Sequence, residues 1–492
     1  MSSAGGGLAV RHSLRLSADP SRVITRLFVP GHEGFEAQES RTGAVLARIL
    51  SLTEREVGAA WNDVAVRFGT RHRDLVGTFR RHAAELADRL DPGLELSEQR
   101  TLLLGATFSN EFAIEGAALC NPSIVEHPDQ SGLAAGSLRF VMSVRGIGEG
   151  HRSSIGFRTG TIDDAGRIGV DAAGPYATAG TPTPTLLDAA VFRSELARVD
   201  AVAEAVAFVL DGLGERFSRA DLDARLQRLQ RNRVTRRHAL DAVAAITAIA
   251  DRSYAVEFPS WTMLSERVLW PATDAEAAGI EDARFVRFVE DDGVATYYAS
   301  YTAYSGSLIS QQLLSTNDFR SFTSEPMVGE ASANKGLALF PRRIRGRFAA
   351  MSRSDRESNT VAFADRPSVW TRATACQYPL AAWEALQLGN CGAPIETDAG
   401  WLVLTHGVGP MRTYSIGAIL VDLEDPTRII GRLSEPLLSP SADEQDGYVP
   451  NVLYSCGSLV HSDTIVLPYG IGDRAIGFAT VSLPALLAAL RP

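Results

Sequence analysis

Cysteine and long apolar runs are scarce in this 492-residue chain. The four cysteines are scattered and form no C-x-x-C pair, so they suggest neither a disulfide framework nor a zinc site, and they indicate a reducing cytoplasm; they are Cys120, Cys376, Cys391 and Cys456. No run approaches the ~18 apolar residues that a membrane span needs. The first residues, MSSAGGGLAVRHSLRL, lack the continuous apolar core of a signal peptide. We therefore expect no membrane partner and no secretion by that route.

Lysine is nearly absent, and positive charge is in deficit. Lys335 is the only lysine among 48 basic residues, against 58 acidic ones, which gives a formal net charge of −10. An acidic chain repels nucleic acid, so we expect no such partner, although a few cations focused in a cleft can still bind an anionic substrate. A lone lysine has two explanations. Codon bias toward arginine would leave it anywhere by chance, whereas a site that needs a compact ammonium would require it.

Two stretches have helical periodicity. In the first, about residues 40–92, Thr53 and Glu56 form a capping box ahead of an apolar stripe. In the second, about 185–250, Ser218 and Asp221 form another. We expect the two stripes to pack together as a helical layer, or against a second subunit in a homo-oligomer. The Arg-rich segment 228–237 has no interleaved aromatic residues, so it is interpreted as a solvated helix face.

The rest of the chain consists of short apolar strands separated by Gly and Asp turns. Five stretches share this rhythm, and they begin near Asn121, Glu281, Asn334, Cys391 and Tyr448. Repeated strand groups favour a β-propeller over a β-sandwich, because each blade is one small antiparallel sheet. The prediction is a mainly β protein, a five-bladed β-propeller with added α-helical segments. The expected domains are a largely helical extension (1–110), the propeller (111–184 and 251–492) and a helical insertion (185–250).

The propeller prediction brings the polar starts of the repeats together around one central channel. Strand alternation then places Asp282 and Arg284 on one face and Glu281 and Ala283 on the other. We therefore expect Glu281→Gln to cost far less activity than Asp282→Asn.

Motifs at these repeat starts resemble glycoside hydrolase family 130, the mannoside phosphorylases and related β-mannosidases. The motifs occur in the family's order: Asn121-Pro122, Gly279–Arg284 (GIEDAR), Tyr298–Tyr304 (YASYTAY), Lys335 with Phe340-Pro341, Ser352-Arg353, Gly400–Gly407 (GWLVLTHG), Gly417–Pro426 (GAILVDLEDP) and Tyr469–Asp473 (YGIGD). Ala283 departs from the proline that is usual in this motif, which keeps the acid but changes backbone stiffness. The helical stretches look like additions to the compact form of the family.

The resemblance implies a five-bladed propeller in which Asp282 is the sole protein acid and passes its proton through a sugar hydroxyl. Inorganic phosphate then attacks the anomeric carbon with inversion, and no metal or organic cofactor is implied. The implied phosphate ligands are Lys335, Arg353 and His406. The implied sugar-contacting positions are Asn121, Arg145, Arg284, Gln387, Tyr448 and Asp473. Gln387 stands in the leaving-sugar subsite, where the family's phosphorylases often carry lysine.

Each of these residues also has a structural interpretation. Asp282 would be an ion-pair partner of Arg284, Arg353 a surface arginine and His406 a hydrogen-bonded core histidine. Tyr448 would fill a blade, and four residues would be turn or capping residues: Asn121, Arg145, Gln387 and Asp473. The resemblance favours the functional interpretation. It also explains why position 335 carries a lysine in a chain that otherwise uses arginine.

The expected activity is that of an inverting β-mannoside phosphorylase, with a mannoside or oligosaccharide and inorganic phosphate as substrates and mannose 1-phosphate as product. The alternatives are a β-mannosidase, a β-mannosyltransferase and a non-catalytic glycan-binding propeller. The retained cations favour phosphorolysis over hydrolysis, because the family's hydrolases have lost them. The linkage and the acceptor sugar stay open.

Overall fold

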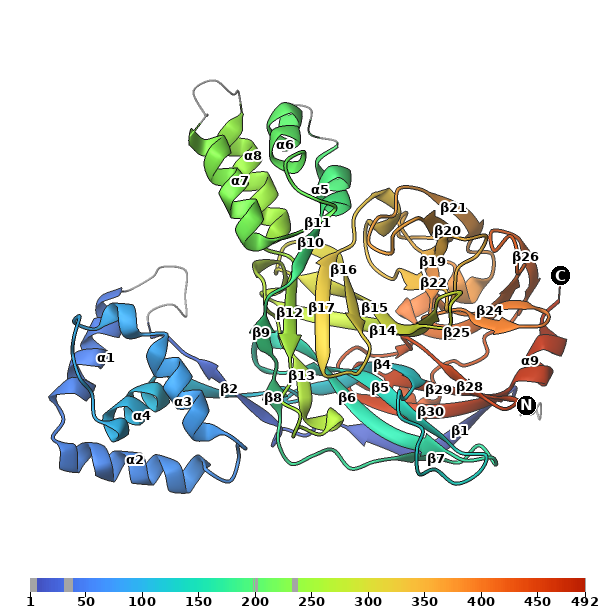
Figure 1. Ribbon diagram of the computed structural model, residues 1–492. Coiled ribbons are helices and arrows are strands. Elements are labelled where there is room, and N and C mark those ends of the chain that lie inside the picture. The colour runs from blue at the N-terminus through green and yellow to red at the C-terminus, as the bar shows by residue number, and fades with distance from the viewer. Residues whose placement is uncertain (1–6, 31–38, 198, 200–201, 232–237, 492) are drawn as a thin grey trace. The chain divides into compact units, whose positions relative to one another are not determined.

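The computed structural model describes residues 7–30, 39–197, 199, 202–231 and 238–491. The chain divides into two compact units. The strand unit comprises Met1–Ala18, Ala117–Ala173 and Ala179–Pro492, and the small helical unit comprises Asp19–Gly116 and Gly174–Thr178. Figure 1 shows both units. In the described part of the chain, no helix has the length and apolar character needed to cross a membrane.

The small helical unit confirms the first helical stretch. Its elements are α1 (Glu39–Ser51), α2 (Glu54–Phe68), α3 (Leu75–Ala84), α4 (Glu98–Thr107), β2 (Val23–Leu27) and β3 (Ser109–Ala113). The capping box forms at the start of α2, where Thr53 accepts from the Glu56 amide and the Glu56 side chain accepts from the Thr53 amide. Leu75 and Phe79 are buried with Leu102 of α4, and Trp61 packs on this cluster. The apolar stripe of residues 40–92 is thus covered inside its own unit.

The second helical stretch forms a separate core in the strand unit. Its elements are β10 (Leu186–Asp188), α5 (Ala189–Leu196), α6 (Ala203–Leu210), β11 (Arg216–Ser218), α7 (Arg219–Arg231) and α8 (Ala239–Ala250), and α7 and α8 lie side by side in Figure 1. Ser218 and Asp221 exchange the two hydrogen bonds of a capping box, as predicted. The end of the Arg-rich segment, residues 232–237, lies outside the described residues.

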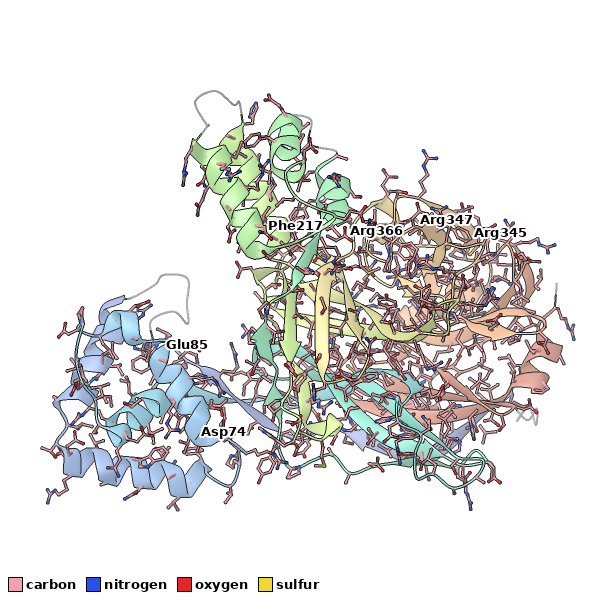
Figure 2. The ribbon with its side chains drawn as sticks, viewed as in Figure 1. Asp74, Glu85, Phe217, Arg345, Arg347 and Arg366 are labelled. Carbon is pink, nitrogen blue, oxygen red and sulfur yellow. The ribbon has the colours of Figure 1, made fainter. Side chains whose placement is uncertain are left out.

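This core reaches the β-strands through a few contacts. Val328 is buried in the same cluster as the helices, and Val369 packs against it. Arg366, labelled in Figure 2, pairs with Asp188 and Glu215, each at 2.9 Å. Each of the two apolar stripes is therefore buried in a cluster of its own, so neither needs the other as cover, contrary to the reason for which they were expected to pack together.

The strands form antiparallel groups in the order of the predicted repeats. The first two groups contain β4 (Ala118–Glu126), β5 (Leu138–Ile147), β6 (Ser153–Ile162) and β7 (Ile168–Val170), then β14 (Gly279–Val289), β15 (Ala295–Tyr304), β16 (Ile309–Thr316), β17 (Ser321–Pro326), β12 (Tyr254–Glu257) and β9 (Thr181–Thr183). The single parallel pairing of Gly279 with Ser153 joins these two groups into one sheet, to which β8 (Thr178–Ala179) and β13 (Arg267–Leu269) also belong.

Three further sheets follow along the chain. They contain β18 (Ala338–Leu339), β19 (Phe348–Ser352), β20 (Asn359–Ala364) and β21 (Ala373–Gln377); β22 (Gln387–Asn390), β23 (Ile395–Thr397), β24 (Gly400–Val408), β25 (Tyr414–Val421) and β26 (Ile429–Arg432); and β27 (Leu453–Tyr454), β28 (Leu459–His461), β29 (Thr464–Ile471), β30 (Ala475–Ser482) and β1 (Ala9–Ser17). β1 pairs antiparallel with β30, so the chain's first strand completes the last sheet. A short helix, α9 (Leu483–Ala489), follows β30.

Candidate active site

A cavity of about 330 Å³ lies in the strand unit and is lined by residues from several sheets and their connections. Its lining residues are Asn121, Arg145, Asp282, Asn334, Lys335, Arg353, Arg356, Gln387, His406, Arg412, Tyr414, Val449, Val452, Tyr454 and Asp473. These residues span more than 350 positions of sequence, so the topology of the sheets brings them together. Most of the side chains are polar or charged, as expected of a site that binds a polar ligand.

Left-handed backbone near the start of β4 and β14, and shortly before β18, accompanies polar side chains that line this cavity. Asn121, Asp282 and Asn334 have φ of 48°, 57° and 68°. The strand register also shifts in β4 between Cys120 and Ser123, and in β14 between Glu281 and Arg284. Asn and Asp tolerate left-handed backbone better than most residues, and a β-bulge redirects a side chain out of the regular alternation. The same combination of left-handed backbone and register shift thus occurs in two strand groups of one sheet.

Asp282 is buried at the centre of the polar residues. The Asn121 side-chain amide donates a hydrogen bond to its Oδ1 at 2.5 Å, and Arg145 Nη1 lies 3.6 Å from the same oxygen. Burial disfavours the charged carboxylate, but the positive charges of Arg145, Lys335 and Arg284 outweigh this effect, so the pKa of Asp282 lies below its usual value. In the free protein Asp282 is therefore ionised at neutral pH.

Glu281 faces the same cations as Asp282, which corrects the prediction from strand alternation. Arg145 Nη2 donates to Glu281 Oε1 at 2.6 Å, and Lys335 Nζ lies 3.9 Å from Oε2. The bulge is the physical reason: Glu281 pairs with Thr302 and Arg284 with Ser300, so the extra residue puts Glu281 and Arg284 on one face of the strand. Ala283 is buried in an apolar cluster, as expected.

Arg284 lies behind the cavity and is not one of its lining residues. Its Nη2 donates to the Tyr454 hydroxyl at 2.6 Å, and its Nη1 donates to the backbone carbonyl of Asp282 at 3.1 Å. Arg284 therefore braces the strand that carries Asp282 and holds Tyr454 in the cavity wall. The arginine that lies within ion-pair distance of the Asp282 carboxylate is instead Arg145.

Lys335, Arg353 and His406 all line the cavity, as the resemblance implies for phosphate ligands. Arg353 Nη1 lies 3.4 Å from His406 Nε2, and His406 Nδ1 lies 3.1 Å from the carbonyl oxygen of Asn390. A carbonyl can only accept, so Nδ1 carries the proton and Nε2 is left to accept from Arg353. Burial, with Arg353 and Arg284 nearby, holds the pKa of His406 well below its usual value. His406 is therefore neutral and orients Arg353.

The neutral His406 predicts a pH dependence of stability. Its pKa is lowered by folding, so at acidic pH the unfolded chain binds a proton that the folded protein excludes, and stability falls as the pH drops below the unfolded value of about 6.5. Between about pH 7.5 and about pH 5.5 this contribution amounts to roughly 1.4 kcal/mol. The measurement is the free energy of unfolding by denaturant for the wild type and for His406→Gln at both pH values. Between the higher and the lower pH, this free energy should fall less in the variant than in the wild type. Equal losses would mean that His406 is charged in the folded protein.

The implied sugar-contacting residues divide into two groups. Asn121, Arg145, Gln387 and Asp473 line the cavity. Burial raises the pKa of Asp473, and the nearby Asp282 adds to this, although Arg145 opposes it. Tyr448 is not a lining residue: it is 55% exposed, and its hydroxyl lies 2.8 Å from His151 Nδ1.

Two buried donors and one buried acceptor at this site have no hydrogen-bond partner among the described residues. They are Arg145 Nε, Arg353 Nε and Asn121 Oδ1. Native proteins rarely leave such groups unpaired, so these atoms indicate where a polar ligand would bind.

Sequence reasoning missed Arg356, Arg412, Tyr414 and Tyr454, which also line the cavity. The sequence carried a weak signal only for Arg356, which stands three residues after Arg353 in the same turn. All four cysteines are free thiols. Within the described ranges, no group of three or more His, Cys, Asp or Glu side chains is arranged to hold a metal ion.

Comparison with known proteins agrees with the motifs. Residues 238–491 match the model of glycoside hydrolase family 130, described as beta-1,4-mannooligosaccharide phosphorylase. A 1,2-beta-oligomannan phosphorylase of a Thermoanaerobacter species is 33% identical over 224 residues, which are 45% of this chain and 74% of that protein. A beta-1,2-mannobiose phosphorylase of Listeria innocua is 28% identical over 234 residues, covering 46% of this chain and 64% of that protein.

A solved structure of the Listeria innocua beta-1,2-mannobiose phosphorylase in complex with beta-1,2-mannobiose aligns with a TM-score of 0.44 at 20% identity, over 77% of this chain and 93% of that one. The family model covers more than half of the chain, including Asp282 and the three implied phosphate ligands. The chain therefore belongs to glycoside hydrolase family 130.

Proposed function

We propose that this protein is an inverting β-mannoside phosphorylase that transfers a mannosyl group to inorganic phosphate and releases mannose 1-phosphate. The relatives with known names are mannoside phosphorylases, which supports phosphorolysis of a mannosidic bond. We also propose that the antiparallel strand groups are the blades of a five-bladed propeller, with the cavity at the mouth of its channel. The proposed domains are those expected from the sequence, except that β1 belongs with the propeller.

One observation supports this function above the others: Asp282 shares a single cavity with Lys335 and Arg353. In this proposal phosphate binds to the two cations and attacks the anomeric carbon, so no protein base is needed. The bound dianion also offsets the positive charge around Asp282, which raises the pKa of that carboxyl toward the protonated form that an acid requires. Asp282 then gives its proton, through a sugar hydroxyl, to the leaving oxygen.

A hydrolase would need a second carboxylate to activate water. Glu281 Oε1 already accepts from Arg145 Nη2 at 2.6 Å, so this oxygen is engaged in an ion pair. Asp473, which lines the cavity and has a raised pKa, is the carboxylate that favours this alternative. The two functions differ in the product, since phosphorolysis gives mannose 1-phosphate and hydrolysis gives free mannose.

Product analysis on a β-mannoside tests the proposal. We expect mannose 1-phosphate in the presence of inorganic phosphate and almost no turnover in its absence. Lys335→Ala and Arg353→Ala should raise the KM for phosphate by about tenfold or more, because each removes a charge-assisted hydrogen bond. Release of free mannose at the same rate with and without phosphate would establish hydrolysis instead.

We further propose that the substrates are a mannoside or oligosaccharide and phosphate, with no metal or organic cofactor. A homo-oligomer and a location in the reducing cytoplasm complete the proposal. The four free thiols are compatible with that compartment.

A further inference from the structure

Two arginines of the cavity have no part in the proposed phosphorolysis. Arg356 and Arg412 line it, and both are exposed at its edge. Their backbones are left-handed, with φ of 71° and 56°. Non-glycine residues seldom adopt this conformation, which concentrates at functional sites. Arg356 lies in the connection between β19 and β20, and Arg412 in the connection between β24 and β25.

Neither arginine has an acidic partner. Across the described ranges, no carboxylate lies within ion-pair distance of Arg356 or Arg412. By contrast, Arg343 pairs with Glu290 at 2.7 Å and Arg347 pairs with Asp365 at 2.9 Å. Unpaired guanidinium groups at the mouth of one cavity raise its positive potential and offer planar donors to an anion.

Both arginines flank the first residue of β22, Gln387. The Leu388 amide donates to the carbonyl of Glu357 at 3.0 Å, which ties the turn of Arg356 to this strand. On the other side, Gln387 pairs with Val408, the last residue before the tight connection that holds Arg412. Gln387 is the residue that the resemblance associates with the leaving sugar. The two guanidinium groups therefore border the leaving-sugar side of the cavity.

We propose that Arg356 and Arg412 bind an anionic group carried by the leaving sugar, which is the acceptor sugar of the reverse reaction. The inference builds on the proposed phosphorolysis and specifies its substrate class: β-mannosides whose leaving sugar bears a phosphate or a carboxylate. A guanidinium fork matches both groups, so the shared chemistry is a peripheral anion.

Calorimetric titration tests this without turnover. The protein is saturated with inorganic phosphate, so that the phosphate site is occupied, and titrated with mannose 6-phosphate against mannose and with glucuronate against glucose. At least one charged sugar should bind about tenfold or more tightly than its neutral parent. The pair of sugars with the larger difference in affinity identifies the anion as a phosphate or a carboxylate. In the double variant Arg356→Gln/Arg412→Gln the preference should fall to within about twofold, and the Arg→Lys pair should restore part of it.

Arg345→Gln is the matched control. Arg345, labelled in Figure 2, is also an exposed arginine with a left-handed backbone, φ 51°, but it is not a lining residue of the cavity. This variant should keep the wild-type preference.

Two results would overturn the inference. One is equal affinity of the wild type for charged and neutral sugars. The other is a double variant that binds inorganic phosphate more weakly yet keeps its preference among sugars, since the arginines would then serve the phosphate site. Phosphate release from mannose 1-phosphate, measured with both the neutral and the charged sugars as acceptors, tests the phosphorylase function separately. Failure with every acceptor would reject that function, while the titration still decides whether the arginines bind an anionic sugar.

Discussion

Asp282→Asn should lower phosphorolysis of an unactivated β-mannoside by at least about 10²–10⁴-fold while the protein stays folded. The amide has nearly the shape of the carboxyl, and its oxygen can still accept the hydrogen bond from Asn121. It cannot supply the proton that the leaving oxygen needs. The measurement is the rate of mannose 1-phosphate formation, together with the midpoint of thermal unfolding.

The matched control is Asp188→Asn, because Asp188 is also buried and bound to an arginine but lies at the helical insertion. That change should lower stability and leave turnover within a few-fold. A mannoside with an activated aryl leaving group should partly rescue Asp282→Asn, since such a group departs without a proton. If Asp282→Asn kept full activity on the unactivated mannoside, Asp282 would not be the acid.

Glu281→Gln is expected to have the second-largest effect, contrary to the small effect that strand alternation predicts. Glu281 holds Arg145 Nη2 at 2.6 Å, and its other oxygen lies 3.9 Å from Lys335. Without this negative charge both cations act more strongly on Asp282, so the pKa of that acid falls further. The alkaline limb of the pH profile of kcat should move to lower pH by roughly one unit, and activity at neutral pH should drop about tenfold.

Glu444→Gln separates this effect from a general loss of stability. Glu444 is more deeply buried than Glu281 and pairs with Arg11 at 2.9 Å and Arg15 at 3.4 Å, but neither of these arginines lines the cavity. Its substitution should lower the unfolding midpoint without moving the pH profile. A Glu281→Gln enzyme with a wild-type pH profile and a normal rate would show that Glu281 serves only the local fold.

Local patterns in the sequence predicted the elements of the fold. The capping boxes at Thr53 and Ser218 form as expected, because a cap depends on residues three positions apart. The alternation of apolar residues predicted strand groups in the correct order, since each hairpin pairs neighbouring segments. Motif positions also indicated most of the cavity, including Asp282, Lys335 and Arg353.

Tertiary structure decided how those residues work together. The direction of the Glu281 side chain depends on a β-bulge, and a bulge forms only when two strands pair in a particular register. The neutral state of His406 depends on its burial against Arg353 and on the carbonyl of Asn390, which lies on a neighbouring strand. The place of Arg356 and Arg412 beside Gln387 depends on connections from two different sheets meeting at one cavity. The sequence by itself determined which side chains were present and which local elements they formed. The charge state of His406, the direction of the Glu281 side chain and the convergence of these residues at one cavity followed from long-range packing.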